Sequence, residues 1–545
     1  MPVISFDYKD FSSLLGRRVP IDELSERLPM IGADLDKVEG STITIEFFPD
    51  RPDLLSVEGV ARAMRAFLGF EKGQKKYETA QSGVVLNVDG SVKSVRPFIA
   101  AAVVEGVSMT DEMVASIMDL QEKLHVGLGR KRSKVAIGVH NADAVKPPFT
   151  YKAVKPDSIR FVPLMKDEEM NLDEILEKHE KGTTYAHLLR GFNRYPLIVD
   201  SNGDVLSFPP VINGELTAVT GYTTNFFVDV TGTDQKAVNQ ALNIVATTLA
   251  ERGGSIKTVE IAGPDGSKMI TPALAPLHMD IDVSYVNSLL GTNMDAAGIC
   301  DCLAKMEYNT EDAGSGRIRA FFPAWRADIL HKIDVVEDIA TGYGFENFKG
   351  SVPTALTFGK GLESRELSAA ARAAMTGLGF SEVMSLTLSN EGDQFGRMGL
   401  EDGKRVTLEN PITEEHTCIR VSVLPSLLRM LAANKHRELP QSLFEAGEVV
   451  GYDEGEPANK MRLAAVRIAS RTGFTECKSL VEAAVRDIFG KPLSIVENRH
   501  PAFVTGRCAA IMVDGTECGV FGELHPRTIT NFELEYPVIA FEMQL

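Results

Sequence analysis

The alternation of apolar and polar residues divides the first part of the chain into a small group of elements and a polar connection. Apolar residues recur at helical spacing over residues 57–69, which predicts an amphipathic helix that ends at a glycine. Residues 22–28 form a second predicted helix, and residues 41–48 a strand between the two. The polar stretch 71–83 has no apolar periodicity and indicates a linker.

The next segment is rich in predicted strands. Asp-Gly and Asn-Gly pairs between apolar alternations predict hairpins at residues 84–92 and 197–208. Two helices interrupt these strands, over residues 110–124 and 233–254.

The rest of the chain mixes helices and strands. Helices are predicted at residues 283–291, 296–306 and 333–344, around a strand at 317–325. A last segment has helices at 362–379 and 479–490 and an Asp-Gly hairpin at 509–524. With 545 residues, the chain is long enough for three to five domains, and we expect an α+β multidomain fold with segments 1–82, 83–265, 268–350 and 355–545.

Charge narrows the possible partners. There are 57 Lys and Arg against 75 Asp and Glu, a net charge of −18, which argues against a protein that coats nucleic acid or an anionic membrane with its whole surface. One local exception is the basic run that holds Arg130, Lys131, Arg132 and Lys134. These residues could contact phosphates or form a solvated loop.

From the cysteine content and the hydropathy of the sequence, we expect a cytoplasmic protein. Six cysteines in 545 residues are too few for a disulfide framework, and Cys300 and Cys302 lack zinc-site spacing. No stretch reaches about 18 uninterrupted apolar residues, so we expect no transmembrane helix. The first residues lack the basic region and following apolar region of a secretory signal peptide, so we expect no secretion.

The most specific local pattern is a group of acidic residues. Asp334, Glu337 and Asp338 are spaced so that a helix projects them from one face, and Asp328 lies at the entry to that helix. Hard oxygen donors of this kind suit Mg²⁺ or Ca²⁺. The alternative is that the acids near a helix N-terminus complement its dipole and face solvent.

A second polar pattern lies on a predicted strand. Asp229 and Thr231 alternate with valines, so both side chains point to one face and could orient a water or bind a polar substrate group. Ser207 and Asn213 form another small polar cluster upstream. The alternative for all four residues is turn chemistry, in which these side chains cap loops.

Several stretches, in order and across essentially the full chain, together resemble the beta subunit of phenylalanine–tRNA ligase of the shorter archaeal/eukaryotic type. They are residues 46–62, 206–217 with 227–234, 323–345 and 419–449. The resemblance implies an N-terminal α/β module, a β-rich editing domain, a small helical, winged-helix-like domain with a metal site, and a degenerate class II synthetase-like antiparallel-sheet domain.

The resemblance also implies roles for single residues. Asp328, Asp334, Glu337 and Asp338 match the family's magnesium site, so Mg²⁺ becomes the expected metal. In the editing domain, which hydrolyses tRNA mischarged with tyrosine, Asp229 and Thr231 match polar pocket positions, with Leu197, Ser207 and Asn213 as further candidates. Asn141 stands where an acidic residue is expected, so the sequence does not support a role for the neighbouring His140.

The class II core carries no visible adenylate chemistry. Phe444 and Glu445 have a motif-like setting without an adjacent Arg to hold ATP phosphates, so we expect no catalytic residue for aminoacylation on this chain. The resemblance implies that an alpha subunit performs that reaction in a complex of two alpha and two beta chains with ATP, phenylalanine and the tRNA for phenylalanine. The alternatives are a non-catalytic binding or scaffold protein with the same folds and a Mg²⁺-dependent phosphohydrolase.

Overall fold

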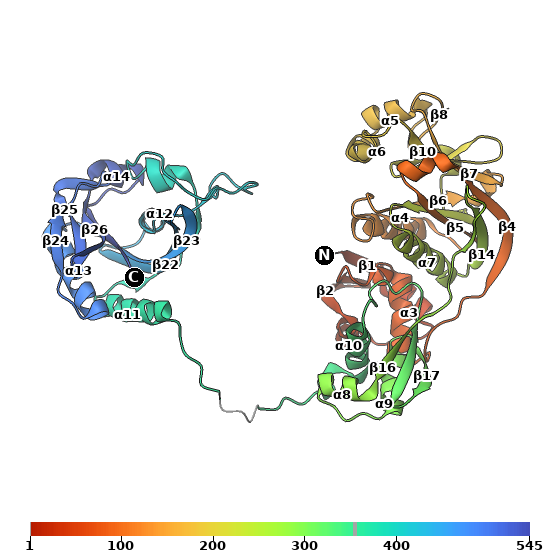
Figure 1. The fold of residues 1–545 in the computed structure, drawn as a ribbon, viewed down its shortest axis with the longest axis horizontal. Coiled ribbons are helices and arrows are strands. Elements are labelled where there is room, and N and C mark those ends of the chain that lie inside the picture. Colours follow the sequence, from red (N-terminus) through yellow and green to blue (C-terminus); the bar gives the residue numbers. More distant parts are fainter. Residues whose placement is uncertain (1, 353–356) are drawn as a thin grey trace. The chain divides into compact units, whose positions relative to one another are not determined.

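The chain forms two compact units in a computed structural model that describes residues 2–352 and 357–545 (Figure 1). The first unit is Met1–Ser351 and the second Val352–Leu545. Residue 355, the expected start of the last segment, lies outside the described residues. Throughout the described ranges, every helix is too short or too polar to span a membrane.

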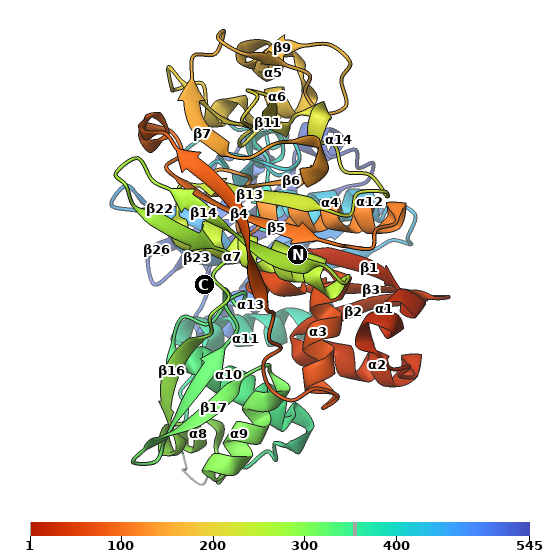
Figure 2. The same ribbon diagram turned by 90° about the vertical axis from the view of Figure 1, so that its right-hand side faces the viewer.

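The first unit begins with a three-stranded antiparallel sheet in the order β1-β3-β2, packed against three helices (Figure 2). Val60 and Met64 of the last helix are fully buried in a core that includes Ile45 and Phe47 of the central strand. The two predicted helices and the predicted strand are confirmed, whereas β1, α1 and β2 were not expected. The elements are β1 (Val3–Asp7), α1 (Tyr8–Leu15), α2 (Ile21–Arg27), β2 (Ala33–Glu39), β3 (Thr42–Phe47) and α3 (Val57–Phe67).

A ten-stranded sheet follows, with β12-β11-β10-β7-β4-β14-β5-β13-β6 as its path and β15 paired to β14. Helix α7 packs on β5 and β13 and buries Val238, Leu242, Val245 and Leu249. The strands are β4 (Thr79–Val88), β5 (Phe98–Glu105), β6 (Val135–Asn141), β7 (Phe149–Val154), β10 (Tyr195–Val199), β11 (Val205–Phe208), β12 (Ile212–Asn213), β13 (Phe226–Gly232), β14 (Ser255–Ala262) and β15 (Lys268–Thr271). The helices are α4 (Asp111–Val126), α5 (Leu172–Lys178), α6 (Glu180–Tyr185) and α7 (Gln235–Glu251), and a short pair, β8 (Arg160–Phe161) and β9 (Met170–Asn171), completes the set.

Of the two hairpins predicted here, one is confirmed and one is wrong. Strands β10 and β11 pair antiparallel around the turn at residues 200–204. At the other position, β4 pairs in parallel with β14 and β7 instead of folding back on itself. The Asp89 side chain accepts a hydrogen bond from the Ser91 amide, which starts a short 3₁₀ turn rather than a hairpin.

The end of the first unit is a three-stranded antiparallel sheet, in the order β16-β18-β17, with three helices. Helices α9 and α10 pack on each other and bury Ile299, Leu303, Val335 and Ile339. All predicted helices of this segment are present. The elements are β16 (Leu277–Asp282), α8 (Val283–Leu290), α9 (Ala296–Lys305), β17 (Asn309–Gly314), β18 (Arg317–Phe322) and α10 (Lys332–Tyr343).

The second unit is a seven-stranded sheet in the order β19-β22-β23-β27-β26-β25-β24, antiparallel except for β19, which runs parallel to β22. Helices α11 and α13 cover one face around Phe444 and Phe521, and α12 covers the other around Leu427 and Phe503. The predicted hairpin is present as β25 and β26. The elements are α11 (Glu363–Gly377), β19 (Ser381–Glu382), α12 (Leu424–Ala433), β22 (Gln441–Asp453), β23 (Glu456–Ile468), α13 (Phe474–Phe489), β24 (Ser494–Glu497), β25 (Phe503–Val513), β26 (Thr516–Leu524), α14 (Pro526–Asn531) and β27 (Val538–Gln544), with a small pair β20 (Leu388–Ser389) and β21 (Cys418–Ile419).

Candidate functional site

A cavity of about 610 Å³ lies in the first unit beside β13, β6 and α4. Asp229 of β13, Ser207 of β11 and Asn213 of β12 all line it. These residues are up to 22 positions apart in the chain, and the strand pairing of the sheet brings them to one place. Three of the five residues expected in the editing pocket therefore share one cavity, while their role in hydrolysis stays a prediction.

Asp229 is held by a buried histidine that sequence reasoning had left without a role. Asp229 is 1% exposed, and its Oδ1 lies 2.7 Å from His140 Nε2. His140 Nδ1 lies 2.8 Å from the hydroxyl of Thr217, which is also buried. Because an ionised carboxylate only accepts hydrogen bonds, His140 must donate through Nε2. The partner that the sequence seemed to lack next to Asn141 is supplied by the neighbouring strand.

Gly138 leaves room for the Asp229 side chain at the cavity wall. Gly138 lies directly opposite Asp229 in the β6–β13 pairing and itself lines the cavity. A Cβ at this position would lie 2.4 Å from Asp229 Oδ1 and 2.6 Å from His140 Nε2. Any side chain here would collide with both groups, so glycine is what the close approach requires.

Ser207 adds a polar group with free hydrogen-bonding capacity. Ser207 is 2% exposed, and its hydroxyl has no partner among the described residues. Asn213 pairs with Ser207 across the two strands, and its Nδ2 donates to the Val139 carbonyl at 3.4 Å. Because burying an unpaired hydroxyl costs free energy, Ser207 is a natural contact for a polar group of a bound ligand.

Thr231 and Leu197 do not line this cavity. Thr231 points to the same face of β13 as Asp229, as the alternation predicted, but Arg96 covers it: Arg96 Nε donates to the Thr231 hydroxyl at 2.9 Å. Burial lowers the pKa of Arg96 to about 10, and the Tyr151 and Asp229 side chains partly oppose this change. Leu197 is fully buried in an apolar cluster with Phe208.

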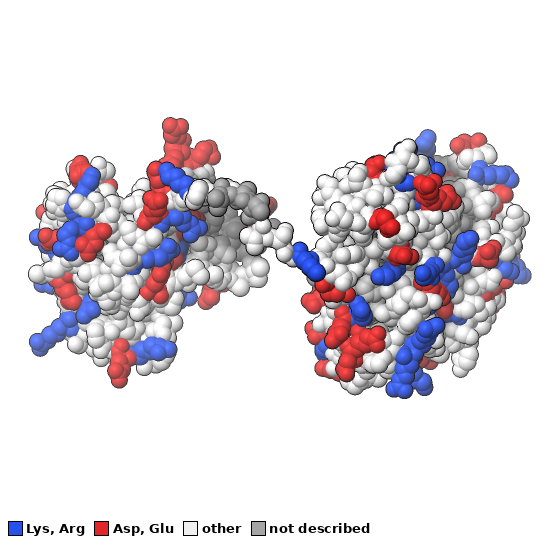
Figure 3. All heavy atoms as spheres, turned by 90° about the horizontal axis from the view of Figure 1, so that it is seen from below, with Lys and Arg blue, Asp and Glu red and all other residues white. Residues whose placement is uncertain are grey.

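Two of the four residues of the basic run at 130–134 have acidic partners within the fold, so the run is not a fully open phosphate-binding loop. Arg132 is buried, and its guanidinium donates to Glu122 at 2.8 Å and to the Val211 carbonyl at 2.8 Å. Lys134 lies 3.4 Å from Asp234. Arg130 and Lys131 alone remain exposed, so the local patch has two available cations, not four. The wider surface mixes acidic and basic residues on the face drawn in Figure 3.

His125 lies between this ion pair and β6. Its Nε2 accepts a hydrogen bond from the Ile137 amide at 2.8 Å, and its Nδ1 lies 3.5 Å from Glu122. Burial lowers the pKa of His125 to about 4, so the imidazole is neutral at pH 7.

The four carboxylates expected to bind magnesium do not fit that ion in the arrangement that the structure describes. Arg326 is 2% exposed and donates to Asp328 at 2.5 Å and to Asp338 at 2.7 Å. Asp334 instead accepts from the backbone amides of Leu330 and His331, at 2.8 and 2.6 Å, and so caps α10. Within residues 2–352 and 357–545, no three His, Cys, Asp or Glu residues are arranged to hold a metal.

Glu337, like Asp334, has no ion pair with Arg326. Its pKa is raised, first by partial burial and then by the negative charges of Asp338, Asp50, Asp334 and Asp328. Such a group of acids would attract a cation. The donor chemistry therefore suits Mg²⁺, whereas the positions of Asp328 and Asp338 suit the arginine that they already bind.

In the second unit, Glu445 contacts an arginine that is distant in the sequence, although no arginine is adjacent to Glu445 in the chain. Arg420 precedes α12, and its Nη2 lies 2.6 Å from Glu445 Oε1. The remaining guanidinium donors bind the Glu448 carbonyl and the Ser385 hydroxyl. Arg420 is 1% exposed. The donors of Arg420 are thus used inside the fold, and the absence of an aminoacylation residue on this chain stays a prediction.

Matches to family models place the chain among the subunits of aminoacyl-tRNA synthetases. Residues 279–345 match the tRNA synthetase B5 domain, and residues 107–272 match the B3/4 domain. Residues 349–545 match the phenylalanyl tRNA synthetase beta chain CLM domain.

Whole-chain relatives identify the family. The chain is 47% identical to the phenylalanine–tRNA ligase beta subunit of Methanothrix thermoacetophila over 100% of both chains, and 43% identical to that of Methanocaldococcus jannaschii over 100% of both. A crystal structure of an N-terminal fragment of the Pyrococcus horikoshii phenylalanyl-tRNA synthetase beta subunit is 40% identical, with a TM-score of 0.61, and covers 63% of this chain and 100% of the fragment. The chain belongs to the family of phenylalanine–tRNA ligase beta subunits.

Proposed function

We propose that this chain works in a complex with an alpha subunit that attaches phenylalanine to its tRNA with ATP, two alpha and two beta chains in each complex. The observation that carries this proposal is the full-length match to beta subunits, joined to a synthetase-like sheet whose Arg420 is buried against Glu445. A chain without a free arginine at that position needs a partner for the adenylate step. In this complex the beta chain supplies a scaffold and a hydrolytic site. We place the complex in the cytoplasm.

The hydrolytic site that we propose is the cavity beside Asp229, and its substrate is tRNA mischarged with tyrosine. His140 donates a hydrogen bond to Oδ1 of Asp229, and the Asp229 side chain lines the cavity. The Asp229 carboxylate and the unpartnered Ser207 hydroxyl would accept a hydrogen bond from the phenol hydroxyl that distinguishes tyrosine from phenylalanine. Hydrogen-bond readout of this kind discriminates by up to about 10⁴–10⁵. His140 and Gly138 hold the carboxylate in position and leave it accessible.

Mg²⁺ at Asp328, Asp334, Glu337 and Asp338 stays a proposal supported by donor chemistry. The oxygens are hard donors, and Glu337 lies among other acids without a bound cation of its own. For all four carboxylates to hold one ion, Arg326 would have to release Asp328 and Asp338. No catalytic step is assigned to this ion.

Reconstitution tests the proposal as a whole. The chain should co-purify with its alpha subunit, and aminoacylation of the tRNA with phenylalanine should need both chains. The same complex should release tyrosine from Tyr-tRNA and leave Phe-tRNA intact. Aminoacylation by this chain alone would contradict the assignment, and a complex that charges tRNA but leaves Tyr-tRNA intact would contradict the editing role only.

A further inference from the structure

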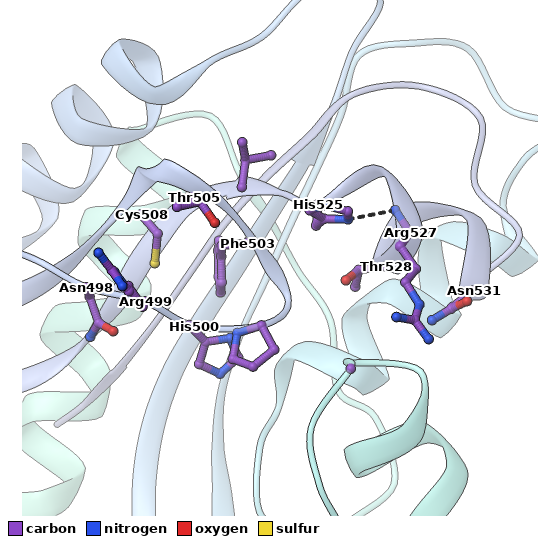
Figure 4. Close-up of a pocket in the computed structure, with 13 residues that line it drawn as sticks. Asn498, Arg499, His500, Phe503, Thr505, Cys508, His525, Arg527, Thr528 and Asn531 are labelled. Carbon is purple, nitrogen blue, oxygen red and sulfur yellow. Dashed lines mark hydrogen bonds between the residues drawn. The ribbon is translucent and has the colours of Figure 1, made fainter.

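A second cavity, of about 350 Å³, lies in the second unit between the β24–β25 connection, the start of β25 and α14 (Figure 4). Its charged lining is basic: Arg499 and Arg527 line it together with His500 and His525, and its wall contains no Asp or Glu. In a chain with 75 acidic residues and 57 basic ones, a cavity wall of this composition favours an anion.

The two histidines present fixed hydrogen-bond donors. His500 Nδ1 accepts from the Ala502 amide at 3.2 Å, and His525 Nδ1 accepts from the Arg527 amide at 3.1 Å. With Nδ1 used as an acceptor, each neutral ring carries its proton on Nε2. His500 is further fixed by an edge-to-face contact with Phe503, whose ring centroid is 5.2 Å away. Burial lowers the pKa of His500, which keeps it a neutral donor.

The two arginines add charge at the rim. Arg499 and Arg527 are exposed and come from different elements, the β24–β25 connection and α14. Neither guanidinium has an ion-pair partner among the described residues, in contrast to Arg372, Arg405 and Arg420 of the same unit. An arginine without a carboxylate partner is free to donate two parallel hydrogen bonds to a phosphate group.

This cavity is not a remnant of the ATP site expected from the class II resemblance. Phe444 and Glu445 lie on β22, the second strand in the sheet order, whereas the cavity adjoins β25, the sixth. The two places are separated by β23, β27 and β26. The cavity is therefore a different place on the sheet from that of Phe444 and Glu445.

We propose that the Arg499–Arg527 cavity binds a phosphate group of an RNA strand, and this rests on the proposed function, in which tRNA is the substrate of the complex. The charged groups lie at an exposed rim, where a polymer that passes over the mouth can reach them. His500 and His525 line the same cavity, and their Nε2–H groups would donate hydrogen bonds to the phosphate oxygens. The site would help an acidic chain to hold a polyanion through a local contact.

The test uses the full alpha/beta complex, with fluorescently labelled tRNA and, separately, ATP as probes. The double variant Arg499→Ala/Arg527→Ala should weaken tRNA binding about tenfold at low salt and lower the salt dependence of log Kd by about one to two, because one contact per arginine is lost. ATP binding should not change. Arg471→Ala, an exposed arginine of the same unit outside the cavity, is the matched control and should bind tRNA as the wild type does.

Each contrary result has one meaning. Unchanged tRNA affinity and salt slope in the double variant would overturn the proposal. Weaker ATP binding with unchanged tRNA binding would overturn the RNA source and assign the cavity to a free nucleotide. Equal loss in the Arg471→Ala control would show general surface charge and overturn the site. If the wild-type complex failed to bind tRNA at all, the proposed function would fail instead.

Discussion

Asp229 and Asp338 are both buried carboxylates, 1% and 6% exposed, yet their surroundings give them different capacities. Asp229 bonds a histidine on one side and faces a cavity of about 610 Å³ on the other. Asp338 is enclosed by the guanidinium of Arg326 and the hydroxyl of Tyr308, at 2.7 and 2.6 Å. A carboxylate whose charge is cancelled by a fixed cation holds the fold together, whereas one with a free oxygen at a cavity can act on a ligand.

The first way to test this contrast is to remove the cation. Arg326→Met should lower the free energy of unfolding by about 3–5 kcal/mol, because it removes the buried guanidinium that is hydrogen-bonded to the buried Asp338 and to Asp328. Urea denaturation followed by circular dichroism measures this loss. Arg319→Met, which breaks the more exposed pair with Asp280 in the same domain, should cost much less, because water screens that pair. Similar losses in both variants would show that Arg326 is no special counter-ion.

The second test removes the carboxylate that faces the cavity. In the alpha/beta complex, Asp229→Ala should slow the hydrolysis of Tyr-tRNA by about 10²-fold, because the substrate loses its polar partner, and should spare the synthesis of Phe-tRNA. Deacylation and aminoacylation assays with the same preparation measure both rates. Asp157→Ala, an exposed aspartate outside the cavity, serves as control. Undiminished hydrolysis in the Asp229 variant would place the editing site elsewhere.

The local sequence pattern predicted most helices and strands and the face of the sheet to which a side chain points. It did not predict which distant residues those side chains contact. Alternation along residues 226–232 correctly put Asp229 and Thr231 on one face. It could not show that Arg96, 135 positions away, covers Thr231. His140 was set aside because its neighbour Asn141 is not acidic, although the pairing of β6 with β13 provides Asp229.

The four acidic residues around α10 also show that the local pattern does not predict contacts, even between residues close in the sequence. Helical spacing correctly grouped Asp334, Glu337 and Asp338, and Arg326 lies only two positions before Asp328. Which of these side chains meets the arginine depends on the turn before α10, and spacing alone does not describe that turn. The hairpin expected at 84–92 is wrong for a related reason. An Asp-Gly pair fits several kinds of turn, and the local sequence does not show that β4 pairs with the distant strand β14.

A metal titration tests whether the carboxylate group can also hold Mg²⁺. If it does, Asp334→Asn should weaken Mg²⁺ binding to the complex by about tenfold, because one charged oxygen ligand is lost. The amide oxygen of asparagine can still accept from the Leu330 and His331 amides, so the helix cap should survive. Isothermal titration calorimetry gives the affinity, with Asp312→Asn on β17 as control. An unaltered isotherm would leave Asp334 as a helix cap alone.

The smallest expected effect concerns pH and the wall of the Asp229 cavity. His125 has a pKa of about 4 in the fold, below its ordinary 6.5, because burial disfavours its charged form. As the pH falls from 6.5 toward 4, the unfolded chain takes up the proton first, so this contribution to stability is complete above pH 6.5 and is lost at about 1 kcal/mol per pH unit. Urea unfolding at pH 6.5, 5.5 and 4.5 should show this slope in the wild type and in the exposed-site control His278→Gln, and a slope smaller by that amount in His125→Gln. If the wild type and His125→Gln have the same slope, His125 is not a buried neutral group. The wall of the Asp229 cavity would then contain a charged histidine, and its contrast with the charged Arg326 cluster would be weaker.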